Sequence, residues 1–215
     1  MKKRICCFIL AFILIAICQT GCGKKDNGMK KVVLNEVAHS IFYAPQYVAI
    51  EMGYFKDAGI DLVLETGFGA DKTMTALISG NADIGFMGSE STIYAYAEGS
   101  KDYAVNFAGL TQRAGNFLVA REKIDNFSWD MVKGKNVLGG RKGGMPQMVL
   151  EYILKANNID PASDLSIDQS VDFGLTAGAF SGNTEYDFTV EFEPGATSLE
   201  KEGKGYVVAS LGVDS

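Results

Sequence analysis

The sequence predicts an α/β fold made of two lobes, each built around its own sheet. Short apolar runs alternate with amphipathic stretches from Lys31 onward, and glycines separate them. The alternation breaks once, near residues 112–116, where two extended segments follow one another. Alternating strands and helices are typical of parallel sheets covered by helices. We therefore expect one α/β lobe over residues 31–112 and a second over residues 113–210.

The first lobe is predicted to contain three strand–helix units. The predicted strands are Lys31–Asn35, Asp61–Glu65 and Ala82–Phe86, and the predicted helices are Ala44–Met52, Asp71–Ser79 and Glu90–Ala97. Gly53, Gly80 and Gly99 stand just beyond these helices, where glycine commonly ends a helix. Three such units in succession predict a parallel sheet.

The second lobe is predicted to follow the two extended segments, Tyr103–Gln112 and Asn116–Arg121. Its further strands are expected at Asn136–Leu138, Leu165–Ile167, Phe188–Phe192 and Tyr206–Ser210, and its helices at Met145–Ala156, Leu175–Phe180 and Gly195–Glu202. This order repeats the strand–helix alternation of the first lobe and predicts a second α/β layer structure.

The first 30 residues are predicted to export and anchor the protein. Basic residues at positions 2–4 precede an apolar run of 14 residues at positions 5–18, as in a secretory signal. A spanning helix needs about 20 residues, so a cleaved signal peptide over residues 1–21 is favoured over a permanent anchor. Gln19–Cys22 resembles a bacterial lipobox, although lipoboxes normally begin with an aliphatic residue. We expect lipidation at Cys22, a polar tether over residues 22–30, and an extracytoplasmic protein held at the membrane by its lipid.

Composition argues against several classes of function. All four cysteines lie at or before Cys22, so the predicted folded body has none for a disulfide, a zinc thiolate or a nucleophile. His39 is the only histidine, which argues against a multi-histidine metal site. Loss of residues 1–21 removes three basic residues and takes the formal net charge from −6 to −9. Such a surface repels phosphate backbones, so we expect no nucleic-acid partner, and we expect no metal.

Candidate ligand-binding residues stand after the predicted strands, because ligands of open parallel sheets bind beyond the carboxyl ends of the strands. They are His39, Ser40, Phe42, Tyr43, Phe68, Ser89, Glu90, Gly143, Gly144, Met145 and Glu193. The three aromatic residues would stack on a flat ring, although core packing explains any single one of them better. The glycines would let the backbone approach a ligand at the start of the helix at Met145, or they simply form a tight turn.

The polar candidates have more than one interpretation. Glu90 and Glu193 would accept hydrogen bonds from ring amines. Glu193 would equally serve as a negative charge at the start of the helix that follows it. His39 is interpreted as a hydrogen-bonding residue at the pocket or at the hinge.

Several segments resemble one known family. His39–Pro45, followed by Glu51–Phe55, looks like the opening of the NMT1/ThiY-like family of ABC-transporter substrate-binding proteins. The similarity continues in Ala76–Gly85, in Lys133–Lys135 with Gly139–Arg141, and in Phe192–Pro194. This resemblance implies a two-lobed periplasmic-binding-protein type II fold with the ligand between the lobes. Such chains normally return to the first lobe, so residues 211–215 are expected to start a return that is missing, as in a C-terminally truncated member.

The resemblance implies the solute-binding protein of an ABC importer, with a permease and its ATPase as partners and no cofactor. The ligand it favours is a thiamine pyrimidine precursor, while alkanesulfonates, riboflavin and nitrate-like anions stay open. Two alternatives also stay open. Thiamine-pyrimidine synthases are similar and use a histidine with pyridoxal phosphate, but Tyr43 occupies the position of that histidine here. A truncated surface lipoprotein that binds nothing is the other alternative.

Overall fold

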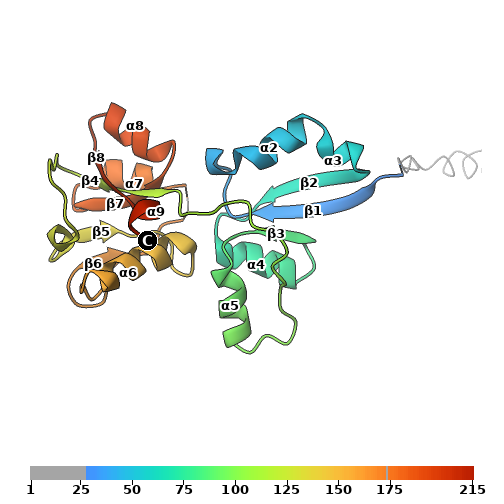
Figure 1. The fold of residues 1–215 in the computed structure, drawn as a ribbon, viewed down its shortest axis with the longest axis horizontal. Helices are drawn as coiled ribbons and strands as arrows, with labels where there is room; N and C mark the ends of the chain where they lie inside the picture. Colours follow the sequence, from blue (N-terminus) through green and yellow to red (C-terminus); the bar gives the residue numbers. More distant parts are fainter. Residues whose placement is uncertain (1–27, 173) are drawn as a thin grey trace, which may run out of the picture. The chain divides into compact units, whose positions relative to one another are not determined.

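The computed structural model describes residues 28–172 and 174–215 (Figure 1). The predicted signal peptide, the predicted lipidation site Cys22 and most of the predicted tether lie outside the described residues. Residues 31–215 form one compact unit. Within the two described ranges, no helix combines the length and the apolar character needed to cross a membrane.

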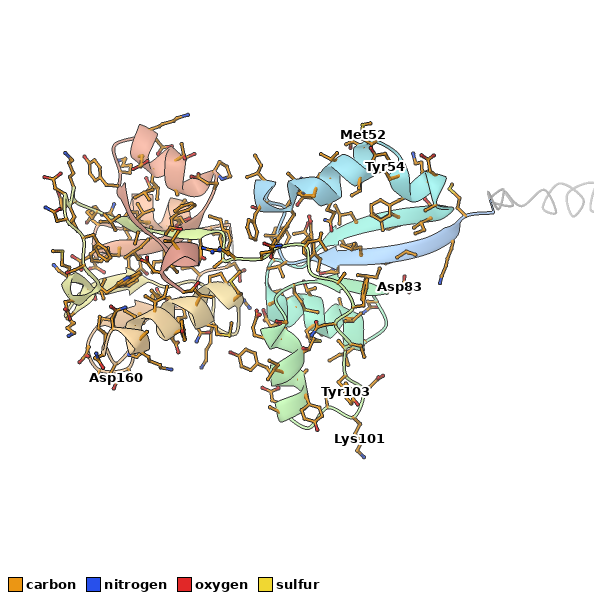
Figure 2. The ribbon with its side chains drawn as sticks, viewed as in Figure 1. Met52, Tyr54, Asp83, Lys101, Tyr103 and Asp160 are labelled. Atoms are coloured by element: carbon orange, nitrogen blue, oxygen red, sulfur yellow. The ribbon has the colours of Figure 1, made fainter. Side chains whose placement is uncertain are left out.

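The first sheet has three strands, β1 (Lys30–Glu36), β2 (Ile60–Thr66) and β3 (Ile84–Phe86), in the order β2-β1-β3. Its helices are α2 (Ala44–Glu51), α3 (Tyr54–Asp57), α4 (Ala70–Ile78) and α5 (Glu90–Ala97), and a 3-10 turn covers Ile41–Tyr43. β1 pairs in parallel with β3, with Leu34 opposite Ile84, which confirms the predicted parallel pairing. Short α3 was not predicted. It follows α2 and packs on β2, and Met52 and Tyr54, labelled in Figure 2, are more than half exposed.

The segment from Glu98 to Gly115 contains neither helix nor strand and leads into the second sheet. The second of the two predicted extended segments is confirmed as β4 (Asn116–Ala120). The first, Tyr103–Gln112, does not form a strand. Its alternating apolar residues are exposed: Tyr103 by 54%, and Val105 and Phe107 by 77% each. Alternation alone predicts a strand only where a neighbouring strand supplies hydrogen-bond partners.

The second sheet contains β4, β5 (Asn136–Leu138), β6 (Ser166–Asp168), β7 (Phe188–Phe192) and β8 (Tyr206–Ser210), in the order β6-β5-β7-β4-β8. β5 runs parallel to both β6 and β7, as the strand–helix alternation predicts. β4 lies between β7 and β8 and runs antiparallel to both. The sheet is therefore mixed, because the entering strand runs against the strands that are joined by helices.

Buried apolar side chains pack on both faces of the second sheet. Its helices are α6 (Met145–Ala156), α7 (Thr176–Gly182), α8 (Gly195–Lys201) and α9 (Leu211–Asp214), with a 3-10 turn at Trp129–Val132. Leu118 faces α6, and its neighbour Val119 faces Phe180 of α7, as the two-residue period of a strand requires. Residues 211–214, where a return to the first lobe was expected to start, form α9. Leu211 is fully buried in the core of the second sheet.

Candidate functional site

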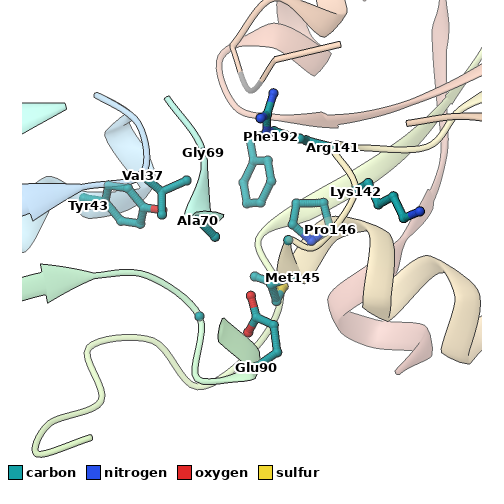
Figure 3. Close-up of a pocket in the computed structure, with 12 residues that line it drawn as sticks. Val37, Tyr43, Gly69, Ala70, Glu90, Arg141, Lys142, Met145, Pro146 and Phe192 are labelled. Atoms are coloured by element: carbon teal, nitrogen blue, oxygen red, sulfur yellow. The ribbon is translucent and has the colours of Figure 1, made fainter. Parts of the chain in front are cut away.

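A cleft is lined by residues that follow strands of both sheets (Figure 3). The lining residues are Val37, Tyr43, Gly69, Ala70, Gly88, Glu90, Arg141, Lys142, Gly144, Met145, Pro146 and Phe192. It holds about 490 Å³ of space not filled by atoms, part of it open to solvent. Four predicted site residues therefore come together here, namely Tyr43, Glu90, Gly144 and Met145. Their common origin at strand ends is the arrangement in which α/β proteins bind small molecules.

Two aromatic residues, Tyr43 and Phe192, line the cleft, and each packs against another ring. The ring of Tyr43 lies 4.4 Å from that of Phe86, and the ring of Phe42 lies 5.4 Å from that of Phe192. Phe42 itself does not line the cleft, and it fills the space beside Gly115, where a Cβ would come within 2.1 Å of its ring. Burial raises the pKa of Tyr43 far above its usual range, so its hydroxyl stays protonated and can donate a hydrogen bond.

Glu90 supplies a buried acceptor at the cleft. It is the first residue of α5 and only 4% exposed, and its Oε1 has no hydrogen-bond partner among the described residues. Burial raises the pKa of Glu90, while backbone N–H groups, including that of Met145, oppose the shift. Figure 3 shows the Glu90 carboxyl group beside Met145. A buried polar atom without a partner is costly, so a ligand donor placed here would be bound favourably.

Arg141 lines the cleft and is paired with two carboxylates. Its Nε and Nη2 donate to Asp71 Oδ1 and Oδ2 at 3.1 and 2.9 Å, and its Nη1 donates to Asp172. The hydrogen bonds from Arg141 lower the pKa of Asp71. Asp71 belongs to α4, beside the first sheet, whereas Arg141 follows β5 of the second. Sequence reasoning did not assign roles to Asp71 and Asp172, because the pairing joins residues up to 70 positions apart.

The glycine-rich turn before α6 is shaped by its own contacts. Gly143 has a φ of 82°, and its N–H donates to Gln147 Oε1 at 2.6 Å. Gly140 has a φ of 83°, and a Cβ there would lie 2.9 Å from Pro146. Only glycine adopts such backbone conformations at little cost. The turn brings Gly144 and Met145 to the cleft, whereas Gly143 itself does not line it.

The other predicted residues have positions outside the cleft lining. His39 Nδ1 bonds to Glu36 at 3.0 Å, and the histidine side chain is 69% exposed. The Oγ of Ser40 accepts from the N–H of Phe42 and caps the 3-10 turn. Phe68 is 55% exposed with a φ of 58°, and Ser89 is exposed just before α5.

Glu193 also lies outside the cleft lining. Its carboxylate accepts from the N–H and the hydroxyl of Thr197 at 3.1 and 2.8 Å. These are the contacts of a carboxylate at the start of a helix, here α8, which is the second of the two roles that the sequence left open.

Sequence reasoning missed Glu36, whose carboxylate organises the end of β1. It is fully buried and accepts from Gln46 Nε2 at 2.8 Å, from the Tyr47 hydroxyl at 2.9 Å and from the Thr66 hydroxyl at 3.3 Å. Together with His39 these side chains tie α2 and β2 to β1. A lone acidic residue at a strand end gave no signal of this cluster in the sequence.

Glu191 on β7 is a second buried carboxyl group that the sequence did not mark. It is 4% exposed and accepts from the hydroxyls of Thr176 and Thr189 at 3.0 and 2.7 Å. Burial raises its pKa to about 7. It does not line the cleft. In the described ranges no group of three or more histidine, cysteine, aspartate or glutamate side chains is placed to hold a metal ion.

Comparison with known proteins identifies relatives by sequence. Residues 41–193 match the family described as NMT1/THI5 like. The protein YtlA of Bacillus subtilis (strain 168) is 50% identical over 192 residues, which are 89% of this chain and 57% of YtlA. The chain thus spans little more than half the length of this relative.

Solved structures show which fold this is. The alkanesulfonate-binding protein SsuA from Xanthomonas axonopodis pv. citri, bound to MOPS, superposes with a TM-score of 0.63 at 18% identity, over 85% of this chain and 60% of SsuA. The nitrate-binding protein NrtA from Synechocystis PCC 6803 superposes with a TM-score of 0.59 at 18% identity, over 83% of this chain and 51% of NrtA. At such identities the likeness shows the fold alone, which is that of type II periplasmic binding proteins.

Proposed function

We propose, because this chain belongs to the NMT1/THI5-like family, that it is the extracytoplasmic solute-binding component of an ABC importer. The observation that carries the proposal is the cleft, which takes its lining from the strand ends of both sheets. In this proposal residues 31–112 and 113–210 are two lobes that hold a small molecule between them. Solute-binding proteins named for alkanesulfonates and for nitrate share the fold. The protein captures its ligand and does not transform it.

The partners follow from this role. A permease and its ATPase would receive the ligand, and a lipid on Cys22 would hold the protein at the outer side of the membrane. The family membership and the signal-like residues 1–21 support both proposals.

The ligand we propose is a thiamine pyrimidine precursor such as hydroxymethylpyrimidine. Its flat ring would stack on Tyr43 or Phe192, which both line the cleft. Its exocyclic amine would donate to Glu90, whose Oε1 lacks a partner among the described residues. A carboxylate that receives an amine donor in a buried site discriminates strongly against ligands without that donor.

Calorimetry and thermal unfolding with hydroxymethylpyrimidine test this proposal. The wild-type protein is expected to bind and to be stabilised by mass action. Glu90→Gln is expected to weaken binding by about tenfold or more, because hydrogen bonds to charged groups contribute about 1.5–3 kcal/mol. Glu98→Gln, at the exposed end of the same helix, is the matched control and should bind as wild type. Absence of both heat and thermal stabilisation in the wild-type protein would refute the proposed ligand.

A further inference from the structure

We propose that Asp71 and Asp172 are specificity-determining residues that neutralise Arg141, so that the cleft rejects oxyanions such as nitrate and sulfonates. This inference rests on the proposed function in one respect: the cleft must be the ligand site. It concerns what the site excludes, and it is separable from the identity of the ligand that the site accepts.

The geometry around Arg141 shows how the neutralisation works. A guanidinium has five N–H donors, and three of its nitrogens here are already engaged by two carboxylates. The side chains of Arg141, Asp172 and Asp71 are 24%, 35% and 51% exposed, so water screens the two ion pairs in part. Asp71 engages the guanidinium in the two-pronged manner that arginine also uses to bind oxyanions. The edge formed by Nε and Nη2 is thus occupied by Asp71, and an oxyanion approaching the two remaining N–H groups would meet two negative charges beside them.

The other charged groups at the cleft do not restore an anion site. Lys72 contacts Asp172 at 3.5 Å and so is also paired with a carboxylate. Lys142 lines the cleft but is exposed, and Figure 3 shows its side chain directed away from Glu90. The buried Glu90 carboxyl group repels anions whenever it is ionised. The cleft region thus has three basic side chains and three acidic ones. Arg141 and Lys72 are paired with carboxylates and Lys142 is exposed to water, whereas Oε1 of the buried Glu90 has no hydrogen-bond partner among the described residues.

A purely structural role for the same ion pairs makes a different prediction. Asp71 and Arg141 connect residues beside the first sheet with the turn after β5 of the second, so their pairing also joins these two parts. If that were their whole role, their removal would lower stability without creating any affinity for anions. The appearance of anion binding therefore separates the two roles.

The test measures nitrate and MOPS binding by calorimetry in a buffer that contains neither. Asp71→Asn with Asp172→Asn keeps the size of both side chains and removes both charges. We expect this double variant to bind at least one of the two anions about tenfold or more tightly than the wild-type protein, because the positive charge of the guanidinium is no longer offset by two neighbouring carboxylates. Addition of Arg141→Gln should abolish the gain.

Asp125→Asn with Asp130→Asn is the matched control. Both carboxylates are exposed, pair with Lys123 and Lys133, and lie outside the cleft lining, so the change in net charge is the same. A gain confined to the Asp71 and Asp172 double variant and lost with Arg141→Gln supports the inference. A folded double variant without a gain, or an equal gain in the control, overturns it.

Two further outcomes keep the result interpretable. If the double variant does not fold, Asp172→Asn alone keeps the Asp71 pair, and a smaller gain is expected from it; a folded single variant without any gain overturns the inference. Failure of the wild-type protein to bind hydroxymethylpyrimidine would refute the proposed ligand and would not change the outcome of the anion-binding test. If that ligand binds but the double variant shows no increase in anion affinity, the proposed function is supported and this inference is refuted.

Discussion

Three buried carboxyl groups differ in the number of side-chain donors that reach them. Glu36 accepts from four side chains, Glu191 accepts from two threonine hydroxyls, and Oε1 of Glu90 has no partner among the described residues. Hydrogen-bond donors reduce the cost of burying a carboxyl group, and a ligand can supply a donor that the protein does not. This difference, and not burial itself, makes Glu90 the candidate binding residue among the three.

Glu191 makes stability depend on pH. Its folded-state pKa of about 7 lies above its ordinary value of 4.5, so the folded protein holds this proton more tightly than the unfolded chain. Its contribution is fully present below pH 4.5 and is lost as the pH rises through about 7. Glu191→Gln is expected to be more stable than wild type at pH 8 by about 1–3 kcal/mol, with the difference shrinking toward pH 5. Urea unfolding at several pH values measures this, and a difference independent of pH would contradict it.

At the scale of elements, α9 packs against the segment that enters the second sheet. A Cβ on Gly212 would lie 2.0 Å from the backbone oxygen of Ala114. Because that oxygen belongs to the main chain, it cannot move aside as a side chain would. The close approach of α9 to the entry of β4 therefore depends on a residue without a side chain.

Gly212→Ala is expected to destabilise the fold by about 1–3 kcal/mol, as overpacking does in a dense interior. Gly178→Ala in α7 is the matched control, since a Cβ there meets nothing within 4 Å. Alanine in a helix interior should be neutral or stabilising by about 0.5–1 kcal/mol. Thermal unfolding compares the two. Equal melting temperatures for the two variants would show that α9 does not pack as described.

At the scale of the whole molecule, the segment from Glu98 to Gly115 connects the first sheet to the second. It has no regular structure, and most of its residues are exposed. Exposed segments without regular secondary structure are the preferred sites of proteolysis. We therefore expect a protease to reach the link between the two sheets more easily than the helices and strands.

Within residues 31–215, brief digestion with trypsin is expected to cut first at Lys101 or Arg113, both exposed in this segment. The products would separate the residues of the first sheet from those of the second, and mass spectrometry identifies them. Lys101→Gln with Arg113→Gln should slow the first cut. A first cut inside a helix, such as at Lys155 of α6, would argue against this account.

Much of the secondary structure could be predicted from local patterns. α6 at Met145–Ala156 and β7 at Phe188–Phe192 have the predicted bounds, because apolar periodicity and glycine punctuation act over a few residues. The positions of Tyr43, Glu90 and Met145 at one cleft follow from the rule that strand ends form binding sites. The exposed Tyr103–Gln112 segment shows the limit of this reasoning, since alternation does not supply a pairing strand.

By itself the sequence determined the α/β class, the family resemblance, most helices and strands, and which turns would carry candidate binding residues, because each depends on short-range pattern. Tertiary structure alone decided that β4 runs against its neighbours, that Glu36 collects four donors, and that Asp71 and Asp172 converge on Arg141. These contacts join residues far apart in the chain, such as Phe117 and Ser210, and their energies depend on distance, burial and direction in space. None of those quantities can be read along a chain.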